Sequence, residues 1–215
     1  MIGLMSGGQT SPRVIKVRYN RRVITNGQLT MIVGPMMSGK SFDVVAIFAP
    51  LQHTDAVVRL YQPRLNVRDT KIQSRVGIGI AADKIASLNE IPMVGLTHVG
   101  IDEIHMFDVS EAEVIQKLLL NGVDVVVSGL DMDYRGTMFA IVKKLFELAP
   151  KEVRYKRAVC YQCRKLEAAY TQIFHRGTPV TQGLPAVVPE DGTYEYKPTC
   201  RRCFVREPAE IPAEW

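Results

Sequence analysis

Apolar and polar stretches alternate from Gly27 to Pro150 in a way that predicts strands and helices following one another. Four short apolar runs have strand length, and the run VDVVVSGL suits the middle of a parallel sheet covered on both faces. The predicted strands are Gln28–Val33, Ala56–Tyr61, a segment within Met93–Ile101, and Val123–Leu130, and the predicted helices are Ser41–Phe48, Ser110–Asn121 and Phe139–Leu148. This alternation predicts an α/β domain with a mostly parallel sheet at residues 27–150.

The segments on either side of this domain differ from it in composition. Residues 1–26 form a basic arm, interpreted as a poorly ordered leader or a partly solvated edge strand, with contact to a partner subunit or to nucleic acid as the alternatives. Residues 151–207 carry all four cysteines, several aromatic residues and scattered glycine and proline, and predict a small β-rich module. Residues 208–215 are interpreted as a tail.

Composition narrows the class of protein. The 215 residues, 47% hydrophobic and 23% charged, suffice for one globular domain with an appendage. A net charge of +5 suits a polyanionic ligand, although a solvated basic surface explains it equally well. No apolar run approaches the roughly 18 residues that a membrane span needs, and the N-terminus lacks the pattern of a secretion signal. We therefore expect a cytoplasmic protein with no membrane partner.

The segment GPMMSGKS fits the phosphate-binding pattern G-x-x-x-x-G-K-[ST] in full. Its residues are Gly34, Pro35, Met36, Met37, Ser38, Gly39, Lys40 and Ser41. Between a strand and a helix, such a loop points backbone N–H groups at phosphates, which then lie at the positive end of the helix dipole. Lys40 can reach the β- and γ-phosphates, and the Ser41 hydroxyl can ligate Mg²⁺. The pattern predicts a binding site for a nucleoside triphosphate.

Two adjacent carboxylates, Asp102 and Glu103, directly follow the predicted strand within Met93–Ile101. Asp102 is expected to hold Mg²⁺, directly or through water, while Glu103 faces the acceptor, because successive side chains of an extended chain point in opposite directions. A solvated acidic pair at a strand end is the alternative.

The four cysteines form the pairs Cys160/Cys163 and Cys200/Cys203. This pairing is typical of a closed tetrahedral Zn²⁺ site, with a redox-active dithiol as the alternative.

Residues 27–204 resemble the zinc-containing, tetrameric type of thymidine kinase, through the stretches GPMMSGKS, VGIDEIHMF, GLDMDYRGTMF, AVCYQCRKLEAAYT and YKPTCRRCF. The resemblance implies a P-loop (RecA-like) sheet with helices on both faces and a small zinc-ribbon lasso domain covering the nucleoside. It implies ATP, Mg²⁺ and structural Zn²⁺ as cofactors, thymidine and deoxyuridine as substrates, a homotetramer and feedback inhibition by dTTP. Glu103 matches the family's catalytic base, and Asp102 its Mg²⁺-associated aspartate.

The resemblance also assigns binding residues. Arg68 matches an arginine near the phosphates, where Arg135 is a further candidate, and His105 is placed with the nucleotide-binding residues. The residues matched to the nucleoside pocket and its covering loop are Met36, Met106, Leu130, Tyr134, Phe139, Thr171, Val187, Val188, Pro189, Glu190, Asp191 and Tyr196. For Met36, Tyr134 and Phe139, ordinary core packing is the alternative.

Several residues depart from the family pattern. Asn66 replaces a common aspartate, His105 a common glutamine and Met106 an aromatic residue, and the covering loop is about one residue longer. His105 is interpreted as a polar residue behind the catalytic groups, with a catalytic role as the alternative. A zinc-ribbon ATPase that binds nucleic acid and a homologue that binds nucleotide without turnover are the competing functions. Acidic residues within residues 151–207 argue against the first, and intact Lys40 and Glu103 against the second.

Overall fold

A computed structural model describes residues 26–66, 71–73, 79–188 and 191–207. Its main sheet has six strands in the order β5-β2-β6-β7-β1-β8, and every neighbouring pair is parallel. The strands of this sheet are β1 Leu29–Val33, β2 Val58–Pro63, β5 Asp83–Ile85, β6 His98–Ile101, β7 Asp124–Gly129 and β8 Glu152–Tyr155. The predicted α/β fold with a mostly parallel sheet is confirmed.

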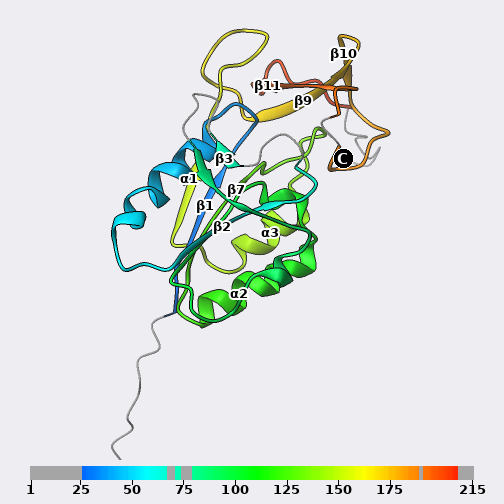
Figure 1. The fold of residues 1–215 in the computed structure, drawn as a ribbon. Coiled ribbons are helices and arrows are strands. Elements are labelled where there is room, and N and C mark those ends of the chain that lie inside the picture. The colour runs from blue at the N-terminus through cyan, green and yellow to red at the C-terminus, as the bar shows by residue number, and fades with distance from the viewer. Residues whose placement is uncertain (1–25, 67–70, 74–78, 189–190, 208–215) are drawn as a thin grey trace, which may run out of the picture.

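Helices cover both faces of the main sheet, as predicted (Figure 1). One face packs against α1, through an apolar cluster that includes Val44, Phe48 and Leu60. The opposite face packs against α2 and α3, through Ile115 and Leu145 among others. The helices are α1 Lys40–Phe48, α2 Ala112–Leu120 and α3 Ala140–Phe146, with 3₁₀ turns at η1 Pro50–His53, η2 Leu88–Glu90, η3 Ile104–Met106 and η4 Val109–Glu111. Among the described residues, no helix has the length and apolar character needed to cross a bilayer.

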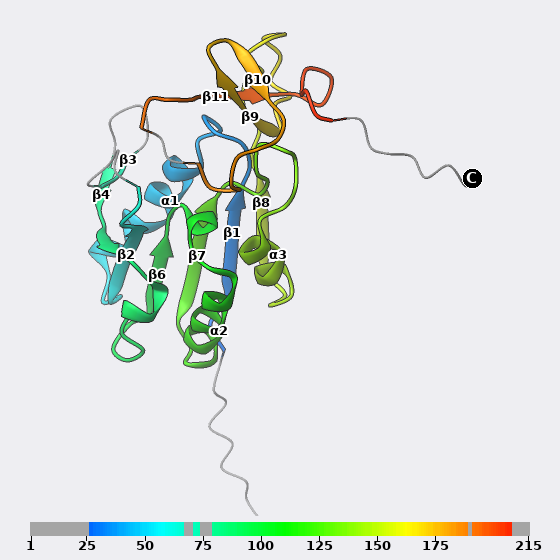
Figure 2. The ribbon, with the colours of Figure 1, turned by 90° about the vertical axis from the view of Figure 1, so that its right-hand side faces the viewer.

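A second, antiparallel sheet lies beyond the carboxyl ends of the main strands (Figure 2). It has the order β10-β9-β11, with β9 at Tyr170–His175, β10 at Thr178–Val180 and β11 at Glu195–Thr199. We call residues 156–207, which contain this sheet and the cysteines, the ribbon. A hairpin of β3 Lys71–Gln73 and β4 Gly79–Ala81 packs beside α1.

Strand β8 was not expected from the sequence. It was grouped with the cysteine-rich segment, but it pairs with β1 at the edge of the main sheet. The chain therefore enters the ribbon directly from the strand next to the P-loop. Gly34 shows how close the two lie, because a Cβ at this residue would be 2.5 Å from the carbonyl oxygen of Lys156.

Candidate active site

The phosphate-binding pattern forms the turn between β1 and α1, as its mechanism requires. Gly34 and Gly39 have φ of 146° and 81°, and Met37 also lies in the left-handed region with φ of 62°. The buried Lys40 donates from Nζ to the carbonyl oxygen of Pro35 at 2.8 Å, so its charge is held within the loop. Backbone and lysine together form a cradle that suits a phosphate group.

Asp102 lies at the carboxyl end of β6, next to this cradle. Ser41 donates its hydroxyl to one carboxylate oxygen at 3.0 Å, and Ser128 at the end of β7 donates to the other. Burial, and then the charge of neighbouring Glu103, raise the pKa of Asp102 to about 6, although the two serine hydroxyls and Lys40 act in the opposite direction. A buried carboxylate beside a serine in the first turn of a helix is suited to binding a cation.

Glu103 has left-handed backbone geometry, with φ of 54° and ψ of 42°. Residues other than glycine adopt this conformation at a cost, and such strain often marks functional sites. After the turn into η3, the Glu103 carboxylate lies 3.5 Å from Nδ1 of His105. The backbone N–H of Leu130 also points to that nitrogen, at 3.3 Å. His105 lines the adjacent pocket together with Met36 of the phosphate loop.

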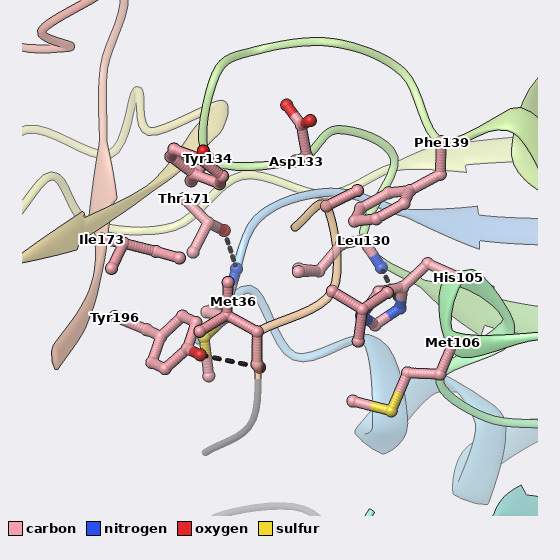
Figure 3. Close-up of a pocket in the computed structure, with 13 residues that line it drawn as sticks. Met36, His105, Met106, Leu130, Asp133, Tyr134, Phe139, Thr171, Ile173 and Tyr196 are labelled. Carbon is pink, nitrogen blue, oxygen red and sulfur yellow. Dashed lines mark hydrogen bonds between the residues drawn. The ribbon is translucent and has the colours of Figure 1, made fainter. Parts of the chain in front are cut away.

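The pocket lies between the main sheet and the ribbon (Figure 3). Its lining residues are Met36, His105, Met106, Leu130, Asp133, Tyr134, Phe139, Thr171, Ile173, Ala186, Val187, Val188 and Tyr196. The structure therefore brings together the described residues that sequence analysis assigned to the nucleoside pocket, except Asp191, which is exposed and accepts the backbone N–H of Thr193. Arg68, Pro189 and Glu190 lie outside the described residues.

The pocket is closed in this structure. Its free volume is about 30 Å³, far below the roughly 300–1,000 Å³ typical of small-molecule sites. Val188 contributes to the closure, because its side chain is buried in a cluster with Tyr134 and Ile173. A ligand of nucleoside size therefore enters only when the covering residues move.

Two tyrosine hydroxyls hold the covering segment, residues 181–188 and 191–194, which we call the lid. Tyr134 donates to the carbonyl oxygen of Leu184 at 2.9 Å and accepts the N–H of Leu184 at 3.0 Å. Tyr196 of β11 donates to the carbonyl oxygen of Val188 at 2.8 Å. The first contact joins the lid to the main domain, and the second joins it to the ribbon's own sheet.

A buried aspartate that sequence analysis missed supports Tyr134. The carboxylate of Asp133 accepts the backbone N–H groups of Arg135 and Thr137 at 2.9 and 3.0 Å. It also pairs with the guanidinium of Arg135, at 2.8 Å to Nε and 2.5 Å to Nη2. This arrangement fixes the loop that carries Tyr134, and it pairs Arg135 with a carboxylate of the same loop. The signal was present in the sequence, since an aspartate in DYRGT is typical of a turn.

Ser128 and Asp131 were also missed. Ser128 is the one hydroxyl inside the apolar run VDVVVSGL, and a polar residue in a buried strand needs a partner, here Asp102. Asp131 follows β7, and burial raises the pKa of its carboxyl, opposed by its own N–H and by the charges of Lys40 and Arg157. Gly129, between them, leaves room for η3, because a Cβ there would approach Nδ1 of His105 to 3.0 Å.

The four cysteines converge as their spacing predicts. Their sulfur atoms all lie within 4.8 Å of one another, and the Sγ atoms of Cys163 and Cys200 are 3.8 Å apart. Four thiolates about 2.3 Å from a central metal would be about 3.8 Å apart along each tetrahedral edge. Burial favours the neutral thiol of Cys160, but backbone N–H groups outweigh it and lower the pKa of that thiol to about 6. The cluster could therefore hold a metal ion with no coordination position left open.

Comparison with known proteins identifies the relatives of this chain. Residues 27–204 match the family model described as thymidine kinase. A thymidine kinase of Mycoplasmoides gallisepticum is 34% identical over 190 residues, which cover 86% of this chain and 84% of that protein. A thymidine kinase of Ureaplasma urealyticum is 30% identical over 161 residues, covering 67% and 72% of the two chains.

Because the charge of Asp102 is buried, we predict that removing it raises the free energy of unfolding. Because the pKa of Asp102 is about 6 in the folded chain and near 3.9 when unfolded, folding favours the protonated form. Its contribution to the free energy of unfolding is therefore largest below pH 4, falls as the pH rises to 6, and stays low above that. In magnesium-free buffer at pH 8, Asp102→Asn should raise the free energy of unfolding by about 1–3 kcal/mol. Urea titrations at pH 8 and pH 5 would test this, with a smaller gain expected at pH 5. A loss of stability at pH 8 would contradict it.

The two hydrogen bonds of the Tyr134 hydroxyl lead to a prediction for hydrogen exchange at Leu184. Tyr134→Phe keeps the ring but removes both hydrogen bonds to Leu184, a change of about 0.5–1.5 kcal/mol for each bond. The amide of Leu184 should then exchange with solvent deuterium about 5- to 100-fold faster in the ligand-free protein. Tyr155→Phe, at an exposed tyrosine on β8, is the matched control. Unchanged exchange at Leu184 would show that the lid is held by other contacts.

Proposed function

The chain belongs to the thymidine kinase family, and on that basis we propose that it transfers the γ-phosphate of ATP to the 5′-hydroxyl of thymidine, with Glu103 as the general base. The observation that carries this assignment is the separation of two neighbouring carboxylates. Asp102 is hydrogen-bonded to Ser41 of the phosphate cradle, whereas Glu103 lies beside His105 in the pocket wall. One acid thus serves the nucleotide side and the other serves the acceptor side.

The proposed reaction begins with ATP in the turn between β1 and α1. The backbone N–H groups of that turn and Lys40 would bind the phosphates, and Ser41 with Asp102 would hold Mg²⁺. These residues fit the ion, because oxygen ligands are already gathered there by the Ser41–Asp102 hydrogen bond. Bound Mg²⁺ supplies charge neutralisation for the phosphate oxygens during transfer. Arg68 stays a candidate for neutralising the charge of the same phosphate oxygens.

Glu103 would accept the proton of the 5′-hydroxyl as that oxygen attacks the γ-phosphate. A base in this reaction must lie within hydrogen-bonding reach of the hydroxyl, and the strained turn at Glu103 directs its carboxylate to the pocket side. His105, which lies 3.5 Å from the Glu103 carboxylate, is itself held in place by the backbone N–H of Leu130.

The pocket favours a flat, partly apolar base. Phe139 and Leu130 form an apolar wall, and Tyr196 lies on the other side of the pocket (Figure 3). Ala186, Val187 and Val188 also line the pocket. Backbone groups that read one base edge would be left unpaired by a purine, and each unpaired group costs about 1–3 kcal/mol. Deoxyuridine lacks only a methyl group, worth at most about 3 kcal/mol, so we propose it as a weaker substrate. Closure of the lid would exclude water from the phosphate transfer.

We further propose that the cysteine cluster holds one structural Zn²⁺. The geometry and the four sulfur donors fit this ion, and no position remains for substrate. A homotetramer and inhibition by dTTP stay predictions from family membership. The alternative of a nucleic-acid-binding ATPase is not favoured, because the comparisons identify thymidine kinases.

Replacing Glu103 with glutamine tests the assignment of the base. Glu103→Gln should lower kcat for thymidine phosphorylation by about 10²–10⁴-fold, because the carboxamide cannot accept the proton. ATP affinity should be nearly unchanged, since the phosphate cradle is intact. Glu113→Gln, at an exposed position of α2, is the matched control. Turnover within a few-fold of the unmodified enzyme would refute the role of Glu103.

Metal analysis and metal removal test the cluster. Purified protein should contain one zinc ion per chain, and Cys163→Ser with Cys203→Ser should abolish it. Hydrogen exchange in the metal-free protein should rise first within residues 164–199, because both ends of that segment are fixed at the cluster. The amides of β7 serve as the internal reference. A zinc-free preparation with full activity and unchanged exchange would rule out structural zinc.

A further inference from the structure

The ribbon contains a second cleft that the reaction described above does not use. Its volume is about 460 Å³, within the range of small-molecule sites. None of its lining residues belongs to the phosphate cradle or to the nucleoside pocket. The two cavities share strand β9, where Tyr170 lines the cleft and the next residue, Thr171, lines the pocket. Successive side chains of a strand point to opposite faces, so the cleft and the pocket lie on opposite sides of β9.

Three arginines surround the cleft. Arg157, Arg201 and Arg202 are exposed, and the only carboxylate in the lining, Glu167, lies 3.4 Å from Arg202. Within the described part of the chain, Arg157 and Arg201 form no ion pair within 4 Å, although the charge of Arg157 lowers the pKa of the buried Asp131 carboxyl. The local charge is therefore positive, and an anion that bound there would relieve the repulsion between the guanidinium groups.

Rigid elements form the floor and one wall of this cleft. Cys200, a buried member of the sulfur cluster, lies at the floor, and Arg201 and Arg202 follow it directly in the chain. Tyr170 is stacked on Phe204 with ring centres 4.4 Å apart and an interplanar angle of 15°. Arginines placed by a fixed turn lose less freedom on binding than arginines on a mobile loop.

We propose that this cleft is a binding site for an oligophosphate group, as found in nucleoside di- and triphosphates and in inorganic polyphosphate. Guanidinium groups bind phosphate oxygens in a planar, bidentate manner, which favours phosphate over smaller or monovalent anions. The ribbon's composition agrees, because residues 156–207 contain nine lysines and arginines against five acidic residues. This excess of four accounts for most of the net charge of +5 of the whole chain.

Chemical footprinting of the arginines tests the proposal without relying on catalysis. The zinc-loaded full-length protein is treated with phenylglyoxal, with and without inorganic tripolyphosphate, and modification of each arginine is followed by mass spectrometry. Tripolyphosphate should slow modification of Arg157 and Arg201 about five-fold or more, because bound phosphate covers their guanidinium groups. Arg164 and Arg176 of the ribbon line no part of the cleft and should react at unchanged rates. Equal protection of all four arginines, or none, would overturn the proposal.

Calorimetry with matched variants gives the second measurement. Arg157→Ala with Arg201→Ala should lose one equivalent of bound tripolyphosphate, whereas Arg164→Ala with Arg176→Ala, which removes the same charge, should retain it. Equal losses in both double variants would show general attraction rather than a site. A parallel titration with ATP identifies the source of the phosphate. Protection of Arg157 at lower ATP than tripolyphosphate concentrations would indicate a nucleotide, and the reverse would indicate inorganic polyphosphate.

Discussion

The buried carboxylate of Asp102 joins the parts of the nucleotide site. It accepts hydrogen bonds from the hydroxyl groups of Ser41 at the start of α1 and Ser128 at the end of β7, while Asp102 itself directly follows β6. Taking a charge out of water is costly, so such a group persists only where partners are fixed around it. The parallel sheet provides those partners, because the carboxyl ends of β1, β6 and β7 meet at one edge. The phosphate cradle, Asp102 and Glu103 are placed together by that single constraint.

The same constraint explains why much of the site could be predicted from the sequence. The cradle, the acidic pair and the cysteines each consist of residues close together in the chain, and their chemistry fixes their geometry. The alternation of apolar runs predicted the parallel sheet for the same reason. The local structure of a short motif depends mainly on its own residues, so the parts of the site that consist of such motifs could be predicted from the sequence.

Contacts between distant segments could not be predicted in this way. Strand β8 was missed because its pattern EVRY is half polar, and only its pairing with β1 makes it part of the main sheet. The left-handed turn at Glu103 has no glycine to mark it, and it is held by packing of η3 against Gly129. The hydrogen bonds between Tyr134 and Leu184 join residues fifty positions apart. Tertiary packing decides each of these features, and a linear pattern does not record it.

One hydrogen bond has a consequence for biosynthesis. The N–H of Met36 in the phosphate cradle donates to Oγ1 of Thr171, a contact between residues 135 positions apart. During translation the main domain leaves the ribosome first and can fold as a unit. The cradle then lacks its ribbon contact, and the pocket lacks Ile173 and Tyr196, until the ribbon has also emerged. A nascent chain that has not yet reached Thr171 can therefore form the sheet without a complete site, so that the site is completed only after the ribbon has been synthesised.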